Sequence, residues 1–215
     1  MADPSRVELL VVAAHPVELE ALRGLLQRKA PSDRLPMVTD DVGVGLAAAG
    51  AGTAQALARH RPAGVLLVGS AGVYPGHSPP IGGVIATSAV HLVDSAVVAG
   101  QAAFPAPMEA TPPIDGALLS RLIALPDVTR ASAATTLAIT TDDDLATTLA
   151  SGGPWEVENL EAFAVALACQ RAGVAFAALL GITNVVGSSG RRQWLDNHRT
   201  SAAQVAELVR QLRSA

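Results

Sequence analysis

Val7-Glu8-Leu9-Leu10-Val11-Val12-Ala13-Ala14 is an almost continuous apolar run, as expected of a strand that is covered on both faces. Residues 17–26 follow with apolar side chains at helical spacing. A buried strand that leads directly into an amphipathic helix is typical of α/β folds, in which helices cover a sheet. This opening therefore predicts the layered architecture of the chain.

The same alternation of strand and helix continues to the C-terminus. Apolar runs bounded by Gly, Pro or Asp predict strands, and Ala-rich or amphipathic runs predict helices. The predicted strands are residues 64–68, 81–90, 132–140, 155–158 and 174–184, and the predicted helices are residues 46–59, 116–125, 160–172 and 200–213. This order favours a three-layer α/β/α fold with a central mixed sheet and a ligand at the carboxyl ends of its strands.

The composition indicates one domain and a small-molecule partner. Half of the 215 residues are apolar and 16% are charged, so we expect a single domain that spans residues 1–215. A formal net charge of -4 argues against binding to nucleic acid or to an anionic membrane, because both need a concentrated basic surface. No apolar run reaches the roughly 20 residues of a membrane-spanning helix.

Cysteine usage favours the cytoplasm. The lone Cys169 has no partner for an intramolecular disulfide, and Met1 to Arg6 lack the basic and apolar segments of a signal peptide. The five histidines are scattered without ligand spacing, and Asp142-Asp143-Asp144 matches no calcium-loop pattern. Gly43-x-Gly45 lacks the third glycine of a dinucleotide fingerprint. We therefore expect no metal and no cofactor.

Four segments place small or polar residues where a strand should end: His15 to Glu18, Gly69 to Gly72, Asn159 to Glu161, and Thr183 to Gly187. In their order along nearly the whole chain they resemble the nucleoside phosphorylase and nucleosidase superfamily. Within it, the hydrolytic methylthioadenosine/adenosylhomocysteine nucleosidases and futalosine hydrolases are the most similar. The resemblance implies cleavage of the N-ribosidic bond of a purine nucleoside, without a cofactor, by a protein that usually forms a homodimer.

The segment VENLEA (residues 157–162) resembles the strand-to-helix signature of this family, which ends in a ribose-binding glutamate. The resemblance assigns that role to Glu161, with Asn159 and Leu160 beside the substrate. A carboxylate accepts hydrogen bonds from two adjacent ribose hydroxyls and stabilises the sugar cation that forms as the base departs. The alternative is a glutamate in a first helical turn that only favours the helix dipole.

Glu18 matches the acidic residue that this family uses to orient or deprotonate the attacking water, which would make it the general base. Glu20 lies two residues on, about 200° around the helix, so only one of the two carboxylates is expected to enter the site. His15 lies beside the predicted water site. The alternative for Glu18 is a solvated acid at a helix start.

Ser70, Ala71 and Gly72 belong to a segment, Gly69 to Gly72, that resembles the family's turn after a central strand. There, tiny side chains let the backbone and a hydroxyl approach the nucleoside. Small-residue turns also serve tight packing alone. We therefore include the three residues as candidate substrate contacts on the strength of the resemblance.

Asn184 stands where the adenine-releasing nucleosidases carry an aspartate that donates a proton to N7 of the leaving base. Asparagine has no such proton, but its NH2 group can bond N7 or the oxygen of a 6-oxopurine, which an ionised carboxylate would repel. Asn184, the following Val-Gly and Arg191-Arg192-Gln193-Trp194 are similar to the futalosine hydrolase pattern. The alternative is an asparagine that caps its own loop.

Other positions carry weaker signals. Leu145 is expected to give backbone contacts to the base and Phe104 a stacking face, although Phe104 is equally explained as core. Phe104 opens a proline-rich loop that either covers a site or crosses the surface. Arg191 and Arg192 either meet a substrate carboxylate or are solvated.

Two departures from the family bear on activity. Leu180 stands where an arginine usually helps to fix the water, and Gly83 stands where an acidic residue is usual.

The sequence therefore leaves several hypotheses about the function. The first is hydrolysis of futalosine to hypoxanthine and dehypoxanthine futalosine, in menaquinone biosynthesis. The alternatives are a methylthioadenosine/adenosylhomocysteine nucleosidase, disfavoured by Asn184, a phosphorylase, disfavoured by the lack of clustered arginines at the site, and a nucleoside-binding relative with little turnover.

Overall fold

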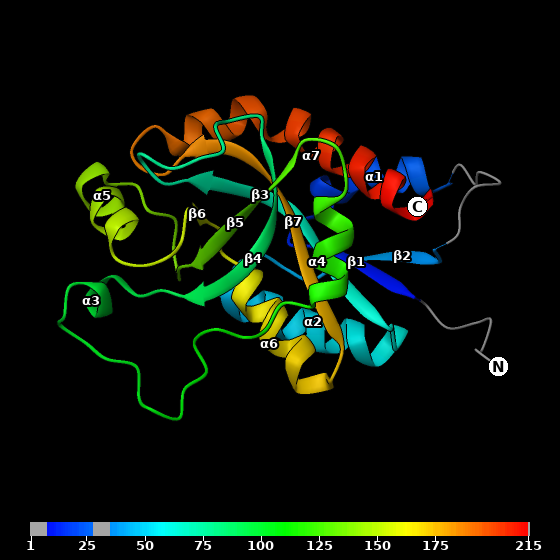
Figure 1. Cartoon of the computed structure of the whole chain (residues 1–215), viewed down its shortest axis with the longest axis horizontal. Helices are drawn as coiled ribbons and strands as arrows, with labels where there is room; N and C mark the ends of the chain where they lie inside the picture. The colour runs from blue at the N-terminus through cyan, green and yellow to red at the C-terminus, as the bar shows by residue number, and fades with distance from the viewer. Residues whose placement is uncertain (1–7, 28–34, 215) are drawn as a thin grey trace.

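A seven-stranded mixed sheet forms the centre of the computed structural model, which describes residues 8–27 and 35–214 (Figure 1). The strands are β1 (Leu9–Ala13), β2 (Met37–Asp41), β3 (Gly64–Val73), β4 (Val84–Leu92), β5 (Val128–Thr135), β6 (Val157–Glu158) and β7 (Ala175–Val185). They lie in the order β2-β1-β3-β6-β5-β4-β7, and β3 also pairs with β7. This extra pairing closes β3, β6, β5, β4 and β7 into a ring, with β1 and β2 as an extension.

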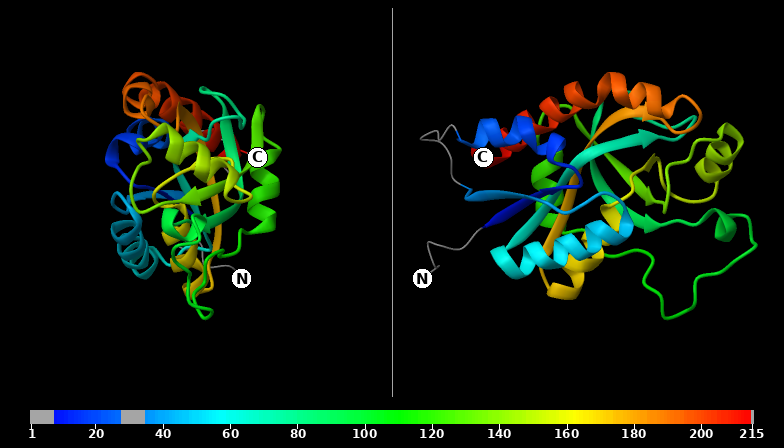
Figure 2. Two further views of the ribbon diagram at one scale, coloured as in Figure 1. Left: turned by 90° about the vertical axis from the view of Figure 1, so that its left-hand side faces the viewer. Right: turned by 180° about the vertical axis from the view of Figure 1, so that it is seen from behind.

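Helices cover both faces of the sheet. They are α1 (Pro16–Gln27), α2 (Leu46–His60), α3 (Ser95–Val98), α4 (Gly116–Ile123), α5 (Asp143–Ser151), α6 (Ala162–Ala172) and α7 (Gly190–Ser214). Figure 2 shows α1 and α7 together on one side of the sheet and α2 and α6 together on the other. α4 packs in the same apolar cluster as α1 and α7. The predicted three-layer α/β/α arrangement around a mixed sheet is confirmed.

The core is built from Ala, Val and Leu, as the scarcity of aromatic residues predicts. β1 is buried along its whole length between β2 and β3, both parallel to it. Glycines, which have no side chain, let helices approach the sheet closely. A Cβ at Gly181 of β7 would collide with the hydroxyl of Ser201 on α7. Dense packing of small residues thus replaces large side-chain anchors.

The element boundaries differ from the predictions in several places. β2, α3 and α5 were not predicted, and α7 begins at Gly190 instead of Thr200. β5 ends at Thr135, so the predicted extension of this strand to residue 140 is wrong. Val7, the predicted start of β1, and Met1 to Arg6, which bear on the signal-peptide prediction, lie outside the described residues.

The prediction of a turn at Gly69 to Gly72 is also wrong, because all four residues belong to β3. β7 pairs with this stretch on one side, and β6 pairs with its last residues on the other. These ladder partners satisfy the backbone and hold the segment extended despite its glycines. The small side chains therefore make room at the end of the sheet rather than bending the chain.

In the described part of the chain, every helix is too short or too polar to cross a lipid bilayer.

Candidate active site

Glu161 lies at the N-terminal end of α6 with only 6% of its surface exposed. Its Oε1 accepts a hydrogen bond of 2.9 Å from the backbone N–H of Gly45, the residue before α2. Its side chain makes no capping bond to its own helix. The simple explanation of Glu161 as a helix-start acid therefore does not account for its position, since the carboxylate is directed to a different segment.

Asn159 holds Glu161 in place. The side-chain Oδ1 of Asn159 accepts the backbone N–H groups of Glu161 at 2.9 Å and Ala162 at 2.8 Å, while its Nδ2 donates to the carbonyl of Ser70 at 3.0 Å. Asn159 thus joins the start of α6 to the end of β3. Leu160 between them is half-buried.

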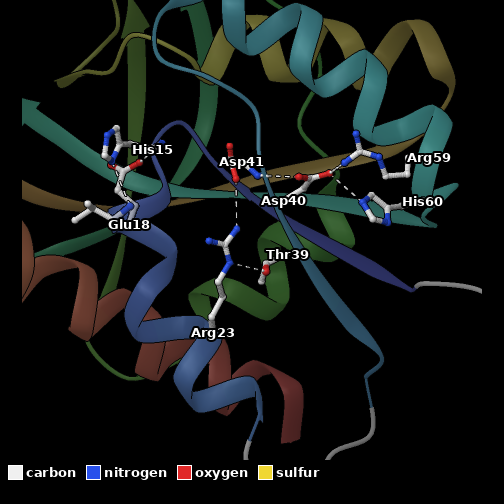
Figure 3. Close-up of polar contacts among 9 residues, drawn as sticks. His15, Glu18, Arg23, Thr39, Asp40, Asp41, Arg59 and His60 are labelled. Atoms are coloured by element: carbon white, nitrogen blue, oxygen red, sulfur yellow. Dashed lines mark hydrogen bonds and ion pairs between the residues drawn. The ribbon is translucent and has the colours of Figure 1, made fainter.

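The carboxylate of Glu18 lies against the end of β3. Its Oε2 accepts the backbone N–H of His15 at 3.3 Å, and its Oε1 accepts the hydroxyl of Ser70 at 3.4 Å. Figure 3 shows His15 and Glu18 together at the start of α1. A Cβ at Gly69 would lie 3.2 Å from Oε1, so the absence of a side chain there gives the carboxylate its space. Glu20 is exposed, as its place on the helix predicts.

Two carboxylates therefore meet in one site. Burial raises the pKa of the Glu18 carboxyl to about 7, and repulsion from Glu161 adds to the rise, against hydrogen bonds from His15 and Ser70 that lower the pKa. Burial also raises the pKa of Glu161, against hydrogen bonds from Gly45, Asn159 and Leu160. A carboxyl that titrates near neutral pH suits a general base.

Asn184 lies at the other end of the same stretch of β3. A bulge in β7 sets its direction: Ala71 pairs with Ile182, but Gly72 pairs with Asn184, so Thr183 is the extra residue. A one-residue shift turns a side chain to the opposite face of a sheet. The shift brings the amide of Asn184 against Gly72, where any side chain would come within 2.7 Å of Nδ2.

The orientation of the Asn184 amide is fixed by its neighbours. Oδ1 accepts the hydroxyl of Thr183 at 2.8 Å, and Nδ2 donates to the carbonyl of Val185 at 3.1 Å. The second hydrogen of Nδ2 has no acceptor among the described residues. The amide therefore keeps one donor for a ligand.

Ser70 lies at the carboxylate end of the site, and Gly72, two residues further along β3, lies at the end that holds the amide of Asn184. Ser70 touches Glu18 and Asn159, and Gly72 touches Asn184. Two residues of a strand rise by roughly 6.6 Å. The structure thus brings together Glu18, Ser70, Asn159, Glu161 and Asn184 along one short stretch of β3, in an arrangement with carboxylates at one end and an amide donor at the other.

Leu145, a predicted backbone contact for the base, lies in α5, and its backbone N–H donates to Oδ1 of Asp142, the N-cap, at 2.8 Å. That N–H is therefore already used. Asp142 and the next two aspartates begin this helix, where they favour its dipole, and this explains the run of three acidic residues.

Asp143 ties α5 to the loop after Asn184. It accepts the backbone N–H and the hydroxyl of Ser188, both at 2.8 Å, and these hydrogen bonds lower the pKa of Asp143. Within residues 8–27 and 35–214, no group of three or more His, Cys, Asp or Glu side chains is placed to hold a metal ion.

Phe104, Arg191 and Arg192 lie outside the group of contacting residues that forms the site. Phe104 is half-buried in the connection between α3 and α4, which runs outside the layers (Figure 1). Arg191 and Arg192 are exposed in the first turn of α7. The described contacts join none of these three residues to Glu18, Glu161 or Asn184.

The two departures from the family have structural reasons. Leu180 is fully buried and is the register partner of Gly69, the residue whose missing side chain gives the Glu18 carboxylate its space. An apolar side chain at this position supplies no charge. Gly83 packs against Pro79, where a Cβ would lie at 2.8 Å, so an acidic side chain does not fit without a shift of that turn.

The sequence did not reveal two of the site's contacts. The glycine pattern at residues 43–45 was set aside because it lacks the third glycine of a dinucleotide fingerprint, but Gly45 supplies the N–H that binds Glu161. Trp194 donates its indole N–H to the hydroxyl of Ser70 at 3.1 Å. The only available signal for Gly45 was its place before an Ala-rich helix, whose N-terminal N–H groups attract anions.

Comparison with known families gives one match. The sequence profile of the phosphorylase superfamily matches residues 21–214. No curated protein sequence matches the chain.

Solved structures with the same fold are numerous, and three illustrate the likeness. A 5′-methylthioadenosine/S-adenosylhomocysteine nucleosidase from Colwellia psychrerythraea, in complex with adenine, has a TM-score of 0.84 and 18% identity over 97% of this chain and 95% of that one. The corresponding nucleosidase from Helicobacter pylori, with butyl-thio-DADMe-Immucillin-A, gives 0.86 and 14% over 96% and 97%. Futalosine hydrolase from H. pylori gives 0.84 and 14% over 96% and 97%.

The raised pKa of Glu18 predicts a pH-dependent stability difference. A carboxyl whose pKa is higher in the folded chain stabilises the fold at low pH, and this contribution is lost as pH rises from 4.5 to about 7. Relative to the wild type, Glu18→Gln should therefore gain melting temperature between pH 4.5 and pH 7.5, on the order of 5 °C. Thermal denaturation across this range measures it.

Glu20→Gln is the matched control, because Glu20 is an exposed glutamate of the same helix. Its melting curve against pH should run parallel to that of the wild type. Parallel curves for Glu18→Gln as well would show that the pKa of Glu18 is not raised in the folded chain.

Proposed function

This chain belongs to the phosphorylase superfamily, and we propose that it hydrolyses the N-ribosidic bond of a purine nucleoside. One observation carries the proposal. The buried carboxylate of Glu161, held by Gly45 and Asn159, faces a second carboxylate, Glu18, across the end of β3. A pair of carboxylates of this kind suits a reaction in which one binds the sugar and the other acts on water.

Each group has a distinct part in the proposed reaction. Glu161 accepts hydrogen bonds from two ribose hydroxyls, and its charge stabilises the cation that develops at C1′. Glu18 takes a proton from the attacking water, whose oxygen forms the new bond to C1′. The C1′–N9 bond breaks, its electron pair stays with the purine, and the purine takes a proton from solvent. Asn184 donates a hydrogen bond to N7 or to the 6-oxo oxygen.

Hydrolysis is favoured over phosphorolysis by the position of the arginines. Arg59 binds Asp40 at 2.8 Å near the C-terminal end of α2, together with His60, as Figure 3 shows. Gly45, which binds Glu161, precedes the opposite end of this 15-residue helix, about 22 Å away. Arg59 is therefore too far from the site to bind a phosphate beside the ribose.

The amide of Asn184 favours a 6-oxopurine as the leaving base, because an NH2 group attracts a carbonyl oxygen that a carboxylate repels. We therefore place futalosine first among the substrates, with hypoxanthine and dehypoxanthine futalosine as products in menaquinone biosynthesis. The exposed Arg191 and Arg192 would then be available for the carboxylate of such a substrate. The second candidate is a nucleoside-binding protein with little turnover, favoured by the buried, apolar Leu180 at the position where the family usually carries an arginine.

Release of free base from futalosine, inosine and methylthioadenosine, followed by chromatography with and without phosphate, tests the function. We expect hypoxanthine from futalosine without phosphate. Glu161→Gln should lower kcat on the order of 100-fold or more, because the neutral amide keeps the shape but loses the charge. Its melting temperature at neutral pH should not fall below that of the wild type, because the substitution removes a carboxyl whose pKa burial raises.

Two results would overturn the proposal. If no nucleoside releases base while one of them still raises the melting temperature, the chain is a binding protein. If Glu161→Gln turns over at the wild-type rate, the ribose assignment is wrong.

Asn184→Asp tests the account of base choice. A carboxyl that can carry a proton to N7 favours a 6-aminopurine, and its ionised form repels a 6-oxo oxygen. The ratio of kcat/KM for methylthioadenosine to that for inosine or futalosine should rise roughly tenfold or more. An unchanged ratio would remove Asn184 from base recognition.

We also propose that the protein forms a homodimer through α2 and α6. The two helices border a groove of about 1010 Å³, lined mostly by small and apolar residues that include Gly50, Ala54 and Leu167. Leu46 and Phe163, at the N-terminal ends of the helices, line the same groove and adjoin Gly45 and Glu161. A partner seated there would therefore bury an apolar surface next to the site.

Ala54→Arg should convert the dimer to a monomer, because a charged side chain would stand in the proposed interface. Light scattering after size exclusion should give twice the chain mass of 21.8 kDa for the wild type and the single mass for the variant. Gln55→Arg, at an exposed position of α2 that lies about 100° around the helix from Ala54 and outside the groove, is the control and should remain dimeric. A monomeric wild type would contradict the proposal.

We finally propose a cytoplasmic location. Cys169 is a free, buried cysteine, and burial raises the pKa of its thiol to about 12. A thiol of this kind is protonated and a poor nucleophile at neutral pH. The chain therefore has no intramolecular disulfide that an oxidising compartment would maintain.

A further inference from the structure

Trp194 and His198 form a stacked pair on the face of α7 that looks toward β3. Their ring centroids are 4.4 Å apart and the planes are inclined by only 12°. The indole N–H of Trp194 donates to the hydroxyl oxygen of Ser70 at 3.1 Å, and Ser70 in turn donates to Oε1 of Glu18 at 3.4 Å. Three residues from α7, β3 and α1 thus form one chain of hydrogen bonds that ends on the proposed general base.

The chemistry of the three groups fixes the direction of this chain. An indole N–H only donates, so the oxygen of Ser70 must accept from Trp194. A hydroxyl has one hydrogen, and in this arrangement it is directed to the Glu18 carboxylate. Hydrogen bonds to the ionised form of an acid favour that form. Trp194 therefore acts on Glu18 through Ser70 without touching it.

The surroundings hold the pair rigidly. Nδ1 of His198 lies 3.1 Å from the carbonyl of Trp194 and 3.2 Å from that of Leu195. Carbonyl oxygens only accept, so Nδ1 carries a hydrogen and the imidazole plane is fixed against the indole. His198 also borders a hollow of about 10 Å³ beside Glu18 and Ser70, which has room for at most one water molecule.

We propose that Trp194 is a positioning residue that orients the hydroxyl of Ser70 on Glu18 and so keeps the general base ionised in the absence of a cation beside it. Leu180, the apolar register partner of Gly69, supplies no such cation. The effect of Trp194 on catalysis rests on the proposed function. The hydrogen-bond chain itself can be tested without a substrate.

Other titratable groups face Glu18, and their titrations must be distinguished from that of Glu18. They are Glu161 at the start of α6, His15 in the turn before α1, and His198 on α7. His198 is the most serious competitor, because it stacks directly on Trp194 with ring centroids 4.4 Å apart. The test therefore compares variants at Glu18 with the wild type.

The first experiment uses the two tryptophans of the chain, which give two indole N–H signals in a 15N-labelled sample. The Trp194 signal should shift with pH with a midpoint of about 7, the pKa of Glu18. This titration should vanish in Glu18→Gln. Trp155, which donates to the carbonyl of Leu149, is the internal control and should not titrate with this midpoint.

Two outcomes of this experiment would overturn the proposal. A Trp194 signal that does not change with pH would show that the hydrogen-bond chain does not reach a titrating group. A titration that persists unchanged in Glu18→Gln would assign it to His198 or Glu161. Both outcomes are independent of whether any nucleoside is cleaved.

The second experiment measures kcat/KM against pH for the substrate that the wild type cleaves. Trp194→Phe keeps the ring and removes the N–H, so the acid limb should move upward by roughly 0.5 pH unit. Ser70→Ala should move it similarly, and the double variant should move it no further than Ser70→Ala alone, because the two residues act in series. Trp155→Phe should leave the limb in place.

An acid limb that stays in place in Trp194→Phe, whatever happens to the melting temperature, would reduce Trp194 to a packing residue. Additive effects in the double variant would show that Trp194 does not act through Ser70. If the wild type cleaves no nucleoside, the proposed function fails, and the indole titration alone decides the hydrogen-bond chain.

Discussion

The placement of two carboxylates, Glu18 and Glu161, in one largely desolvated site is the constraint on which the rest of the site depends. Two carboxylates that face each other away from water are costly, and neither is neutralised by a lysine or arginine among the described contacts. The chain meets the cost with backbone N–H groups from Gly45 and His15 and with the side chains of Asn159 and Ser70. In the proposed reaction, the positive charge that develops on the sugar would relieve the repulsion that Glu161 exerts on Glu18.

The scaffold serves this constraint through small residues and one irregularity. Gly69 leaves room for the Glu18 carboxylate, Gly72 leaves room for Asn184, and the bulge at Thr183 turns Asn184 to the face where Gly72 has no side chain. Hydrogen bonds to β6 and β7 keep the strand extended against the conformational freedom that its glycines lose on folding. The Ala-rich helices allow the same close approach elsewhere in the core.

Much of the fold follows from the sequence, because buried strands are continuous apolar runs and need no further context. Glu18, Glu161 and Asn184 were instead named as candidates from the resemblance of their segments to a family, and the structure brings all three to the end of β3. Contacts that depend on partners distant in the sequence could not be predicted from it. The strand conformation of Gly69 to Gly72 comes from β7, the half-buried edge strand β2 lacks an alternating pattern, and the first turns of α7 are polar. The contact of Trp194 with Ser70 exists only because α7 begins at Gly190.

A crystal structure of the protein with a purine nucleoside bound tests the account most directly. The central claim is that the sugar binds at the paired carboxylates and the base at the amide. The account predicts both ribose hydroxyls within hydrogen-bond distance of the Glu161 carboxylate, with the purine N7 or its 6-oxo oxygen beside Nδ2 of Asn184. A nucleoside bound away from the end of β3, or with its ribose turned away from Glu161, would contradict it.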